Sequence, residues 1–221
     1  MNSNELNHTI IDSIGKENLG EYTKDILEIG VDSIMTDSIL KDIPAIGTLI
    51  NLSKVGVSIR DGILAKKIIR FLDEVDNIGY FERKEFIENI SYDKKYRVRV
   101  GESLIMLLEK MDDLEKPHIM GRLFNCTIKK QIDYEMFLRL SSIVVRSFSP
   151  DLIALQSFAK GRSISEIAKE NLSNQGLLSA AIKKGSEVES TILGLKEKET
   201  NKLDYQMNSL GALLIKFGFN D

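Results

Sequence analysis

The chain has 221 residues, of which 43% are hydrophobic and 29% charged, so it contains enough apolar sequence for one large core or two small ones. A net charge of −3 excludes a strong overall attraction to nucleic acid or anionic lipid, and the single cysteine, Cys126, excludes an intrachain disulfide. Three prolines, no tryptophan and long stretches of helical periodicity predict a mainly α-helical fold. The chain does not open with a basic segment followed by an apolar one, so we expect a cytoplasmic location.

Residues 4–40 are predicted to form one or two helices, interrupted around Gly15–Gly20. The most apolar stretch follows, from Ile43 to Val75. Its first part, Ile43–Ile59, carries only Lys54 as a charged residue, and a charge near the middle of a membrane span would cost about 2.5–3.5 kcal/mol. Pro44 suits the first turn of a helix. We therefore interpret this part as a buried core helix rather than a membrane span.

After Arg60 the sequence becomes amphipathic. One arc of a helix would carry Leu64, Ala65, Ile68, Ile69, Phe71, Leu72 and Val75, and the other Arg60, Lys66, Lys67, Arg70, Asp73 and Glu74. Such a helix can face a protein core, which we favour, or lie on a membrane surface. The candidate membrane-binding or partner-binding residues are Leu49, Val55, Ile59, Leu64, Lys67, Ile68, Arg70 and Phe71.

Further helices are predicted up to about residue 148. Glu82–Ile90 is a short helix, Tyr92–Val100 is ambiguous between strand and helix, and a core-facing stripe follows at Leu104, Leu107, Leu108 and Met111. Pro117 opens a helix that ends near Lys130, and Asp133 caps one that buries Phe137, Leu140, Val144 and Phe148. We expect residues 1–148 to form a helical bundle domain.

The remaining residues, 149–221, have a different pattern. Ser149-Pro150-Asp151 starts one helix, and the capping-box pattern Ser163-x-x-Glu166 starts another that ends near Asn174. Ile192–Leu195 and Leu203–Met207 flank the charged run Lys196–Lys202, which predicts a β-hairpin with the run as its loop. Asn208 or Ser209 then caps a terminal helix that carries Leu210, Leu213, Leu214 and Phe217.

These last segments resemble a winged-helix domain over about residues 150–217. The resemblance rests on Gly176-Leu177-Leu178 after a helix, and on Tyr205-x-Met207-x-x-Leu210-Gly211-x-Leu213-Leu214 after a polar loop. It implies an α+β module with one β-hairpin, in which Ile164–Gln175 would be the recognition helix. In general style the chain is also similar to bacterial helical proteins.

Catalytic and metal-binding patterns are absent from the sequence. His8 and His118 have no partner at metal-ligand spacing, and we find no glycine-rich phosphate loop and no nucleophile elbow. Cys126 lies in an apolar helix, which favours a buried structural thiol. The acidic groups Asp73, Glu74 and Asp76, and Asp112, Asp113 and Glu115, are interpreted as solvated helix ends. The sequence therefore predicts no enzyme activity, no cofactor, no metal and no small-molecule substrate.

Basic residues give the candidate nucleic-acid contacts: Lys94, Lys95, Arg97, Arg99, Lys169, Lys196 and Lys198. We do not favour nucleic acid as a partner, because Glu166 and Glu170 on the recognition helix would face phosphates. Three functions result, in order of preference. The first is a non-enzymatic bacterial interaction or regulatory protein that binds a protein partner or itself. The second is a conditional membrane-active effector of cell-death or phage-defence type that uses residues 43–75. The third is a winged-helix DNA-binding regulator.

Overall fold

The computed structural model describes residues 3–17, 19–20, 40–52, 58–191 and 194–219. These residues are mainly helical and include a two-stranded antiparallel sheet, which confirms the predicted fold class at this level. The chain divides into two compact units, Met1–Ser149 with Phe217–Phe219, and Pro150–Lys216. The predicted helical residues Ile26, Ile29 and Ile34, and the candidate Val55, lie outside the described residues.

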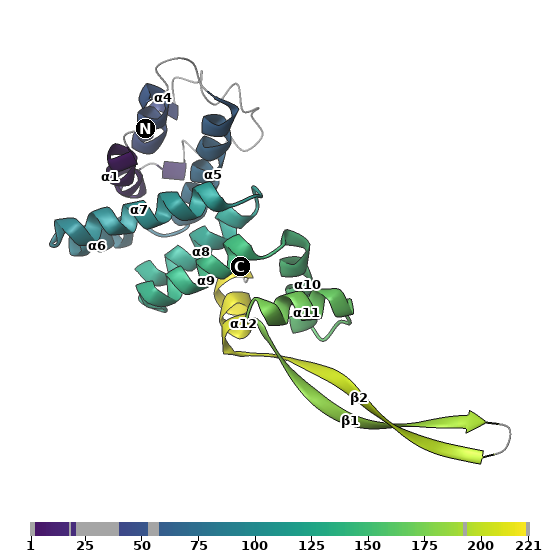
Figure 1. The fold of residues 1–221 in the computed structure, drawn as a ribbon. Helices are drawn as coiled ribbons and strands as arrows, with labels where there is room; N and C mark the ends of the chain where they lie inside the picture. The colour runs from purple at the N-terminus through teal and green to yellow at the C-terminus, as the bar shows by residue number, and fades with distance from the viewer. Residues whose placement is uncertain (1–2, 18, 21–39, 53–57, 192–193, 220–221) are drawn as a thin grey trace. The chain divides into compact units, whose positions relative to one another are not determined.

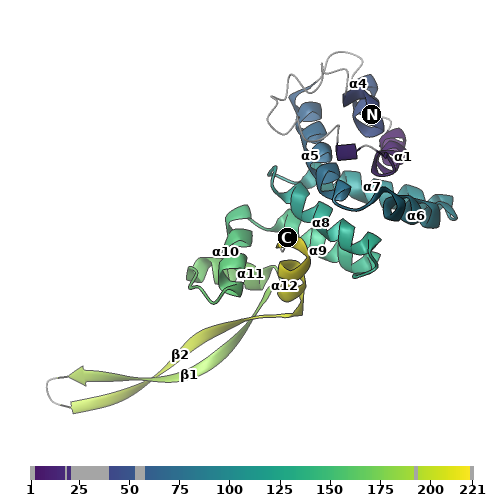
Figure 2. The same ribbon diagram turned by 180° about the vertical axis from the view of Figure 1, so that it is seen from behind.

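The first unit is a set of packed helices (Figures 1 and 2). Here α1 packs against α4 and α7, while α5 packs against α8, which also packs against α9. The helices are α1 (Ser3–Ile14), the 3-10 turn η1 (Leu40–Asp42), α4 (Pro44–Leu52), α5 (Ile59–Asp76), α6 (Tyr80–Ser91), α7 (Lys94–Lys110), α8 (Lys116–Ile128) and α9 (Tyr134–Arg146).

The second unit follows as α10 (Ser149–Ala159), α11 (Glu166–Asn174), β1 (Leu178–Thr191), β2 (Gly194–Met207), α12 (Ser209–Leu214) and the π-helical turn η2 (Ile215–Phe219), whose last residues belong to the first unit. Strands β1 and β2 pair antiparallel from Leu178↔Met207 to Thr191↔Gly194. We call this pair of strands the ribbon.

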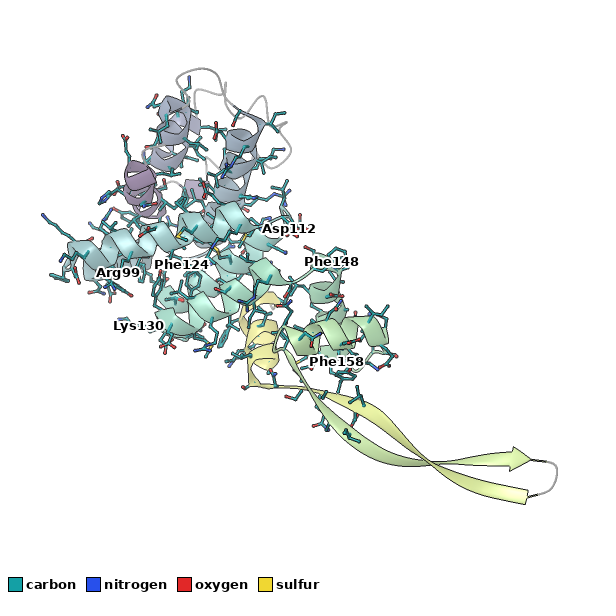
Figure 3. All side chains as sticks on the ribbon, in the orientation of Figure 1. Arg99, Asp112, Phe124, Lys130, Phe148 and Phe158 are labelled. Atoms are coloured by element: carbon teal, nitrogen blue, oxygen red, sulfur yellow. The ribbon has the colours of Figure 1, made fainter. Side chains whose placement is uncertain are left out.

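An aromatic cluster forms the centre of the first core. The Phe124 ring lies 5.6 Å from that of Phe71 and 5.3 Å from that of Phe137, and all three side chains are fully buried. Figure 3 marks the position of Phe124 on α8. The predicted apolar arc of α5 is confirmed, because every residue from Leu64 to Val75 assigned to it is buried. Burial of each large apolar side chain contributes about 1.5–3 kcal/mol, so this arc anchors α5.

Residues at the helix starts explain where several helices begin. Asp93 Oδ1 accepts hydrogen bonds from the backbone N of Lys95 at 2.8 Å and of Tyr96 at 3.2 Å, so the ambiguous segment Tyr92–Val100 enters helix α7 rather than a strand. Asp133 caps α9 as predicted. Ser165, not Ser163, caps α11, because its hydroxyl accepts from the Ala168 N–H three residues later.

The predicted burial of four residues in the first unit is wrong. Lys67 and Glu74, assigned to the polar arc of α5, are 7% and 9% exposed. Phe148, expected to be buried, lies beyond the end of α9 at Arg146 and is 63% exposed (Figure 3). Cys126 is half-buried rather than buried. Helical periodicity assigns a side to each residue, but it cannot show where a helix ends or which polar side chain finds a buried partner.

Helices α1 and α7 approach so closely that a side chain would not fit between them. A Cβ atom built on Gly101 of α7 would lie 1.8 Å from the carbonyl oxygen of Asn7 in α1. Glycine at this position therefore permits backbone contact between two helices that are far apart in sequence.

Gly101→Ala is expected to lower the free energy of unfolding by about 2 kcal/mol or more, because the two helices must separate to admit the methyl group. Urea denaturation followed by circular dichroism measures this change. Gly79→Ala is the matched control, since the nearest heavy atom to its Cβ would be Glu82 Oε2 at 3.6 Å. Equal urea midpoints for the two variants would contradict the close contact.

Candidate functional site

The apolar candidates on α4 and α5 belong to the core of the first unit. The exposed fractions are 1% for Leu49, 5% for Leu64 and 0% for Ile68 and Phe71, whereas Ile59 is 77% exposed. In the described part of the chain, no helix combines the length and apolar character that a membrane span requires. For α4 and α5 to contact a membrane, they would have to leave the core of the first unit. The membrane-active function therefore stays a prediction.

The basic candidates of these helices instead bond within the protein. Lys67 Nζ donates to the carbonyl oxygens of Met111 and, at 3.3 Å, Glu109, where α7 ends. Arg70 donates to the Leu114 carbonyl oxygen at 2.9 Å and pairs with Glu115 at 2.5 Å. Burial lowers the pKa of Lys67, and the nearby Asp112 and Glu109 carboxylates oppose this shift. Both side chains therefore position the segment that joins α7 and α8.

Two further cations are buried at other helix ends. Lys116, which is 0% exposed, pairs with Asp112 at 2.5 Å. It also donates to the carbonyl oxygens of Val145 at 3.3 Å, in the last turn of α9, and of Ser147 at 2.6 Å, just after that helix. Its hydrogen bond lowers the pKa of Asp112. Arg83, which is 1% exposed, pairs with Asp76 at 2.7 Å and donates to the Ile78 and Lys16 carbonyl oxygens.

Glu74 forms a polar junction between α5 and α8. Its carboxylate lies 3.2 Å from Arg122 Nε and 3.4 Å from His118 Nδ1, while Asn125 donates to its backbone carbonyl at 2.6 Å. Burial opposes ionisation of this carboxyl, but the hydrogen bonds and charges of His118 and Arg122 outweigh burial and lower its pKa. No cluster of three His, Cys, Asp or Glu side chains suitable for a metal ion occurs among the described residues.

The four candidate nucleic-acid contacts on α7 differ in their contacts within the first unit. Lys94 and Lys95 are exposed, but Arg97 pairs with Asp12 at 2.6 Å. The Arg99 guanidinium lies 5.8 Å from the centroid of the Tyr96 ring, within the range of a cation–π contact. Two of the four charges are thus engaged within the first unit.

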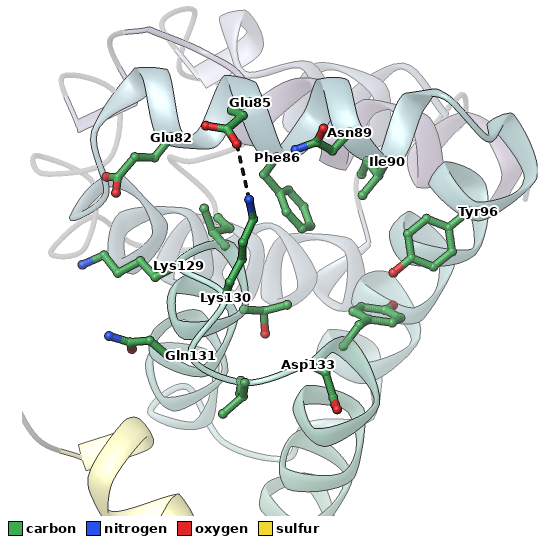
Figure 4. A pocket seen from close by; sticks show the side chains of 14 residues that line it. Glu82, Glu85, Phe86, Asn89, Ile90, Tyr96, Lys129, Lys130, Gln131 and Asp133 are labelled. Carbon is green, nitrogen blue, oxygen red and sulfur yellow. Dashed lines mark hydrogen bonds and ion pairs between the residues drawn. The ribbon is translucent and has the colours of Figure 1, made fainter.

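A cleft of about 640 Å³ lies between α6 and the segment that joins α8 and α9 (Figure 4). Phe86 and Tyr96 line it, and Lys130 crosses it to Glu85 with a separation of 3.4 Å between Nζ and Oε1. Lys130 has a φ of 58°, which L-residues rarely adopt. Burial raises the pKa of Tyr134, on the same wall, to about 12. The volume suits a small molecule, but the lining provides no nucleophile paired with a base.

Exposed aliphatic side chains are prominent in the second unit. Ile153 on α10 is 63% exposed, Ile167 on α11 72%, and Ile182 on β1 and Leu203 on β2 are 70% and 56% exposed. Ile182 and Leu203 are direct partners in the register of the ribbon. Exposed large aliphatic side chains gain free energy when a partner covers them, so these four residues are candidate contact positions. We call these four residues the aliphatic surface.

Asn208 fixes the base of the ribbon. Its Oδ1 accepts from the Gly211 N–H at 3.0 Å, which caps α12, and its Nδ2 donates to the Gly176 carbonyl at 2.9 Å, where α11 has ended. Gly176 itself has a φ of 78°, which favours glycine. One side chain thus joins the residues before β1 to those after β2, and it determines where the ribbon leaves the helices.

The other basic candidates lie in this unit. Lys169 pairs with Glu166 at 2.7 Å, and its side chain is 20% exposed. Lys196 and Lys198 were expected in the hairpin loop, but this is wrong: the whole run Lys196–Lys202 lies in β2 and pairs with residues 183–189 of β1. The alternating Lys-Glu-Lys-Glu sequence fits a strand whose register partners include Glu187 and Glu189, so its charge does not indicate a loop.

Comparison with known proteins finds no protein-family model, no curated protein and no solved structure that matches the chain. The geometry of the described residues is therefore the basis for a functional proposal. The cleft and the aliphatic surface are the two features that sequence reasoning missed. Each unites residues from separate segments, and among the four residues of the aliphatic surface only Leu203 lies in the hairpin pattern of the sequence.

Lys116→Met is expected to lower the free energy of unfolding by about 2 kcal/mol, because two buried carbonyl oxygens lose a charged donor. Chemical denaturation measures it. Arg139→Met is the control, because it removes a cation from an exposed ion pair. The Arg139 side chain is 55% exposed and that of its partner Glu135 is 82% exposed. We expect this variant to change the free energy of unfolding by less than about 0.5 kcal/mol. Similar losses in both variants would refute a special role for Lys116.

The pKa of Glu74 gives a pH prediction. The pKa of this carboxyl is lower in the folded protein than its ordinary value of 4.5. The ionised carboxylate therefore stabilises the fold at pH values above 4.5, and this stabilisation is lost as the pH falls through the folded-state pKa. We expect the wild type to lose stability more steeply than Glu74→Gln between about pH 5 and pH 3. Urea midpoints across this range test it, and parallel profiles would contradict it.

Proposed function

We propose that this protein is a non-enzymatic interaction or regulatory protein, and that it acts through protein–protein contacts made by the second unit. The observation that carries this proposal is the aliphatic surface: Ile153, Ile167, Ile182 and Leu203 are each more than half exposed. Exposed large aliphatic side chains cost free energy in water and gain it when a partner covers them. A cytoplasmic location is part of the same proposal.

We also propose that the second unit is a winged-helix-like module. The order α10, α11, β1 and β2 supports this, with α11 in the place of a recognition helix and the ribbon in the place of the wing. The outer face of α11 favours a protein partner, since Glu166, Ile167 and Glu170 are exposed there. Two carboxylates beside an isoleucine would repel DNA phosphates but can contact an apolar protein surface.

In-cell crosslinking of the full chain, followed by mass spectrometry, tests this proposal. Ile153→Glu combined with Ile167→Glu is expected to reduce crosslinked complexes at least tenfold, since a buried charge at each of two contact positions costs about 1 kcal/mol or more. Phe81→Glu is the matched control, because Phe81 is 81% exposed on α6 of the first unit. Unchanged complexes in the double variant would overturn the proposal.

A gel-shift titration distinguishes the DNA-binding alternative. We expect the wild type to show no binding to duplex DNA that weakens between about 50 and 200 mM salt, because α11 presents no excess of positive charge. Salt-sensitive binding that Lys169→Glu abolishes would replace the protein-binding proposal with DNA recognition.

A further inference from the structure

The cleft between α6 and the segment that joins α8 and α9 has an aromatic wall. Phe86 of α6, Tyr96 of α7 and Tyr134 of α9 line it. The rings of Tyr96 and Tyr134 meet edge to face with their centroids 5.9 Å apart, and the Phe86 ring lies 5.4 Å from that of Phe124 in the core. These contacts fix the positions of the three rings. A preformed apolar wall is typical of small-molecule sites, and a volume of about 640 Å³ lies within their usual range.

The charges of the lining favour a cation over an anion. Glu82, Glu85 and Asp133 contribute carboxylates. Lys129 and Lys130 contribute ammonium groups, so acidic residues outnumber basic ones. The cleft also lies at the C-terminal end of α8, where the backbone carbonyls carry a partial negative charge. The faces of aromatic rings attract cations as well.

An ammonium group of the protein itself occupies part of the cleft. Figure 4 shows Lys130 reaching from the segment that joins α8 and α9 to α6, where its Nζ lies 3.4 Å from Glu85 Oε1. The two side chains are 77% and 66% exposed, and an exposed ion pair of this kind is weak. Another cation can therefore replace Lys130 at Glu85 at little cost. Asp133 caps α9, so we assign ligand recognition to the two carboxylates of α6, Glu82 and Glu85.

The backbone at Lys130 is unfavourable for a lysine. Lys130 follows the end of α8 with a φ of 58°, and there the Gln131 N–H donates to the Cys126 carbonyl oxygen at 2.8 Å. Helices often end with a residue in this left-handed conformation, and it is usually glycine because other side chains are strained there. Lysine keeps a side chain that crosses the cleft, whereas glycine would leave Glu85 without this partner. Backbone strain that is retained beside a cleft points to a function for the strained residue.

We propose that the cleft binds a small organic cation, a protonated amine on a flat apolar body, and that its ammonium group displaces Lys130 from Glu85. The apolar body of the ligand packs on Phe86 and Tyr96. The ligand is bound rather than converted, since the lining has no nucleophile paired with a base. This site lies in the first unit, so it goes beyond the proposed function and does not depend on the aliphatic surface.

A titration of the full chain with phenethylamine, followed by the NMR shifts of backbone amides, tests the site. Phenethylamine is protonated at neutral pH, as lysine is, and a dissociation constant of about 1 mM is expected for so small a ligand. The shifts should concentrate on α6 and residues 127–134. Two compounds with the same ring, 2-phenylethanol and 3-phenylpropanoate, are the neutral and anionic controls, and each should bind at least about threefold more weakly.

Two variants with opposite effects test the displacement of Lys130. Glu85→Gln should weaken binding of phenethylamine about threefold, because the ligand loses its carboxylate. Lys130→Met should tighten binding about threefold, because no resident ammonium group competes for Glu85. Lys129→Met is the matched control, since it removes the same charge from the adjacent exposed residue, and it should change the constant by less than about 1.5-fold. Urea midpoints check that all variants keep the fold.

Several results would overturn the proposal. The site is refuted if no amide shifts at about 20 mM phenethylamine, if the shifts lie away from the cleft, or if either control compound binds as tightly as the amine. Equal effects of Lys130→Met and Lys129→Met would refute the displacement of Lys130. The crosslinks that depend on Ile153 and Ile167 are measured separately, so the proposed function can hold or fail independently of these results.

Discussion

Buried cations that donate to backbone carbonyls hold the helix ends of the first unit. Carbonyls after the last turn of a helix have no partner within the helix, and burial without a donor would cost about 1–3 kcal/mol each. Lys67 supplies donors where α7 ends, Lys116 where α9 ends, and Arg83 after α1. Each cation thereby fixes a loop to a helix distant in sequence. The packing of the aromatic core depends on these three positions, because they determine how the helices can be joined.

The sequence predicts the elements better than it predicts their polar contacts. The periodicity of α5 identifies its buried apolar arc, and Asp133 and Asn208 identify helix starts. These features are local, so residue spacing is sufficient. The burial of Lys67 has no local signal, because its partners belong to the end of α7, more than forty residues later. The cleft escapes prediction for the same reason.

The hairpin shows how a local pattern can also mislead. A run of lysine and glutamate between two apolar segments is typical of a loop, yet here it forms the middle of β2. The register provides the missing information, since the whole run lies opposite residues 183–189 of β1. Among the candidate site residues, sequence reasoning selected α5 for its apolar content. The structure uses that content for the core and exposes Ile167, Ile182 and Leu203 instead.

The two roles of Asn208 restrict what evolution could place there. Serine, threonine or aspartate could offer an oxygen to begin α12, but none has an amide to reach the Gly176 carbonyl. Glutamine has an amide but is longer by one methylene group, which would move its oxygen away from the Gly211 N–H and its nitrogen away from the Gly176 carbonyl. Among related chains, position 208 should therefore stay asparagine while neighbouring surface positions vary. An asparagine at this position would then indicate that a related chain forms its ribbon in the same way.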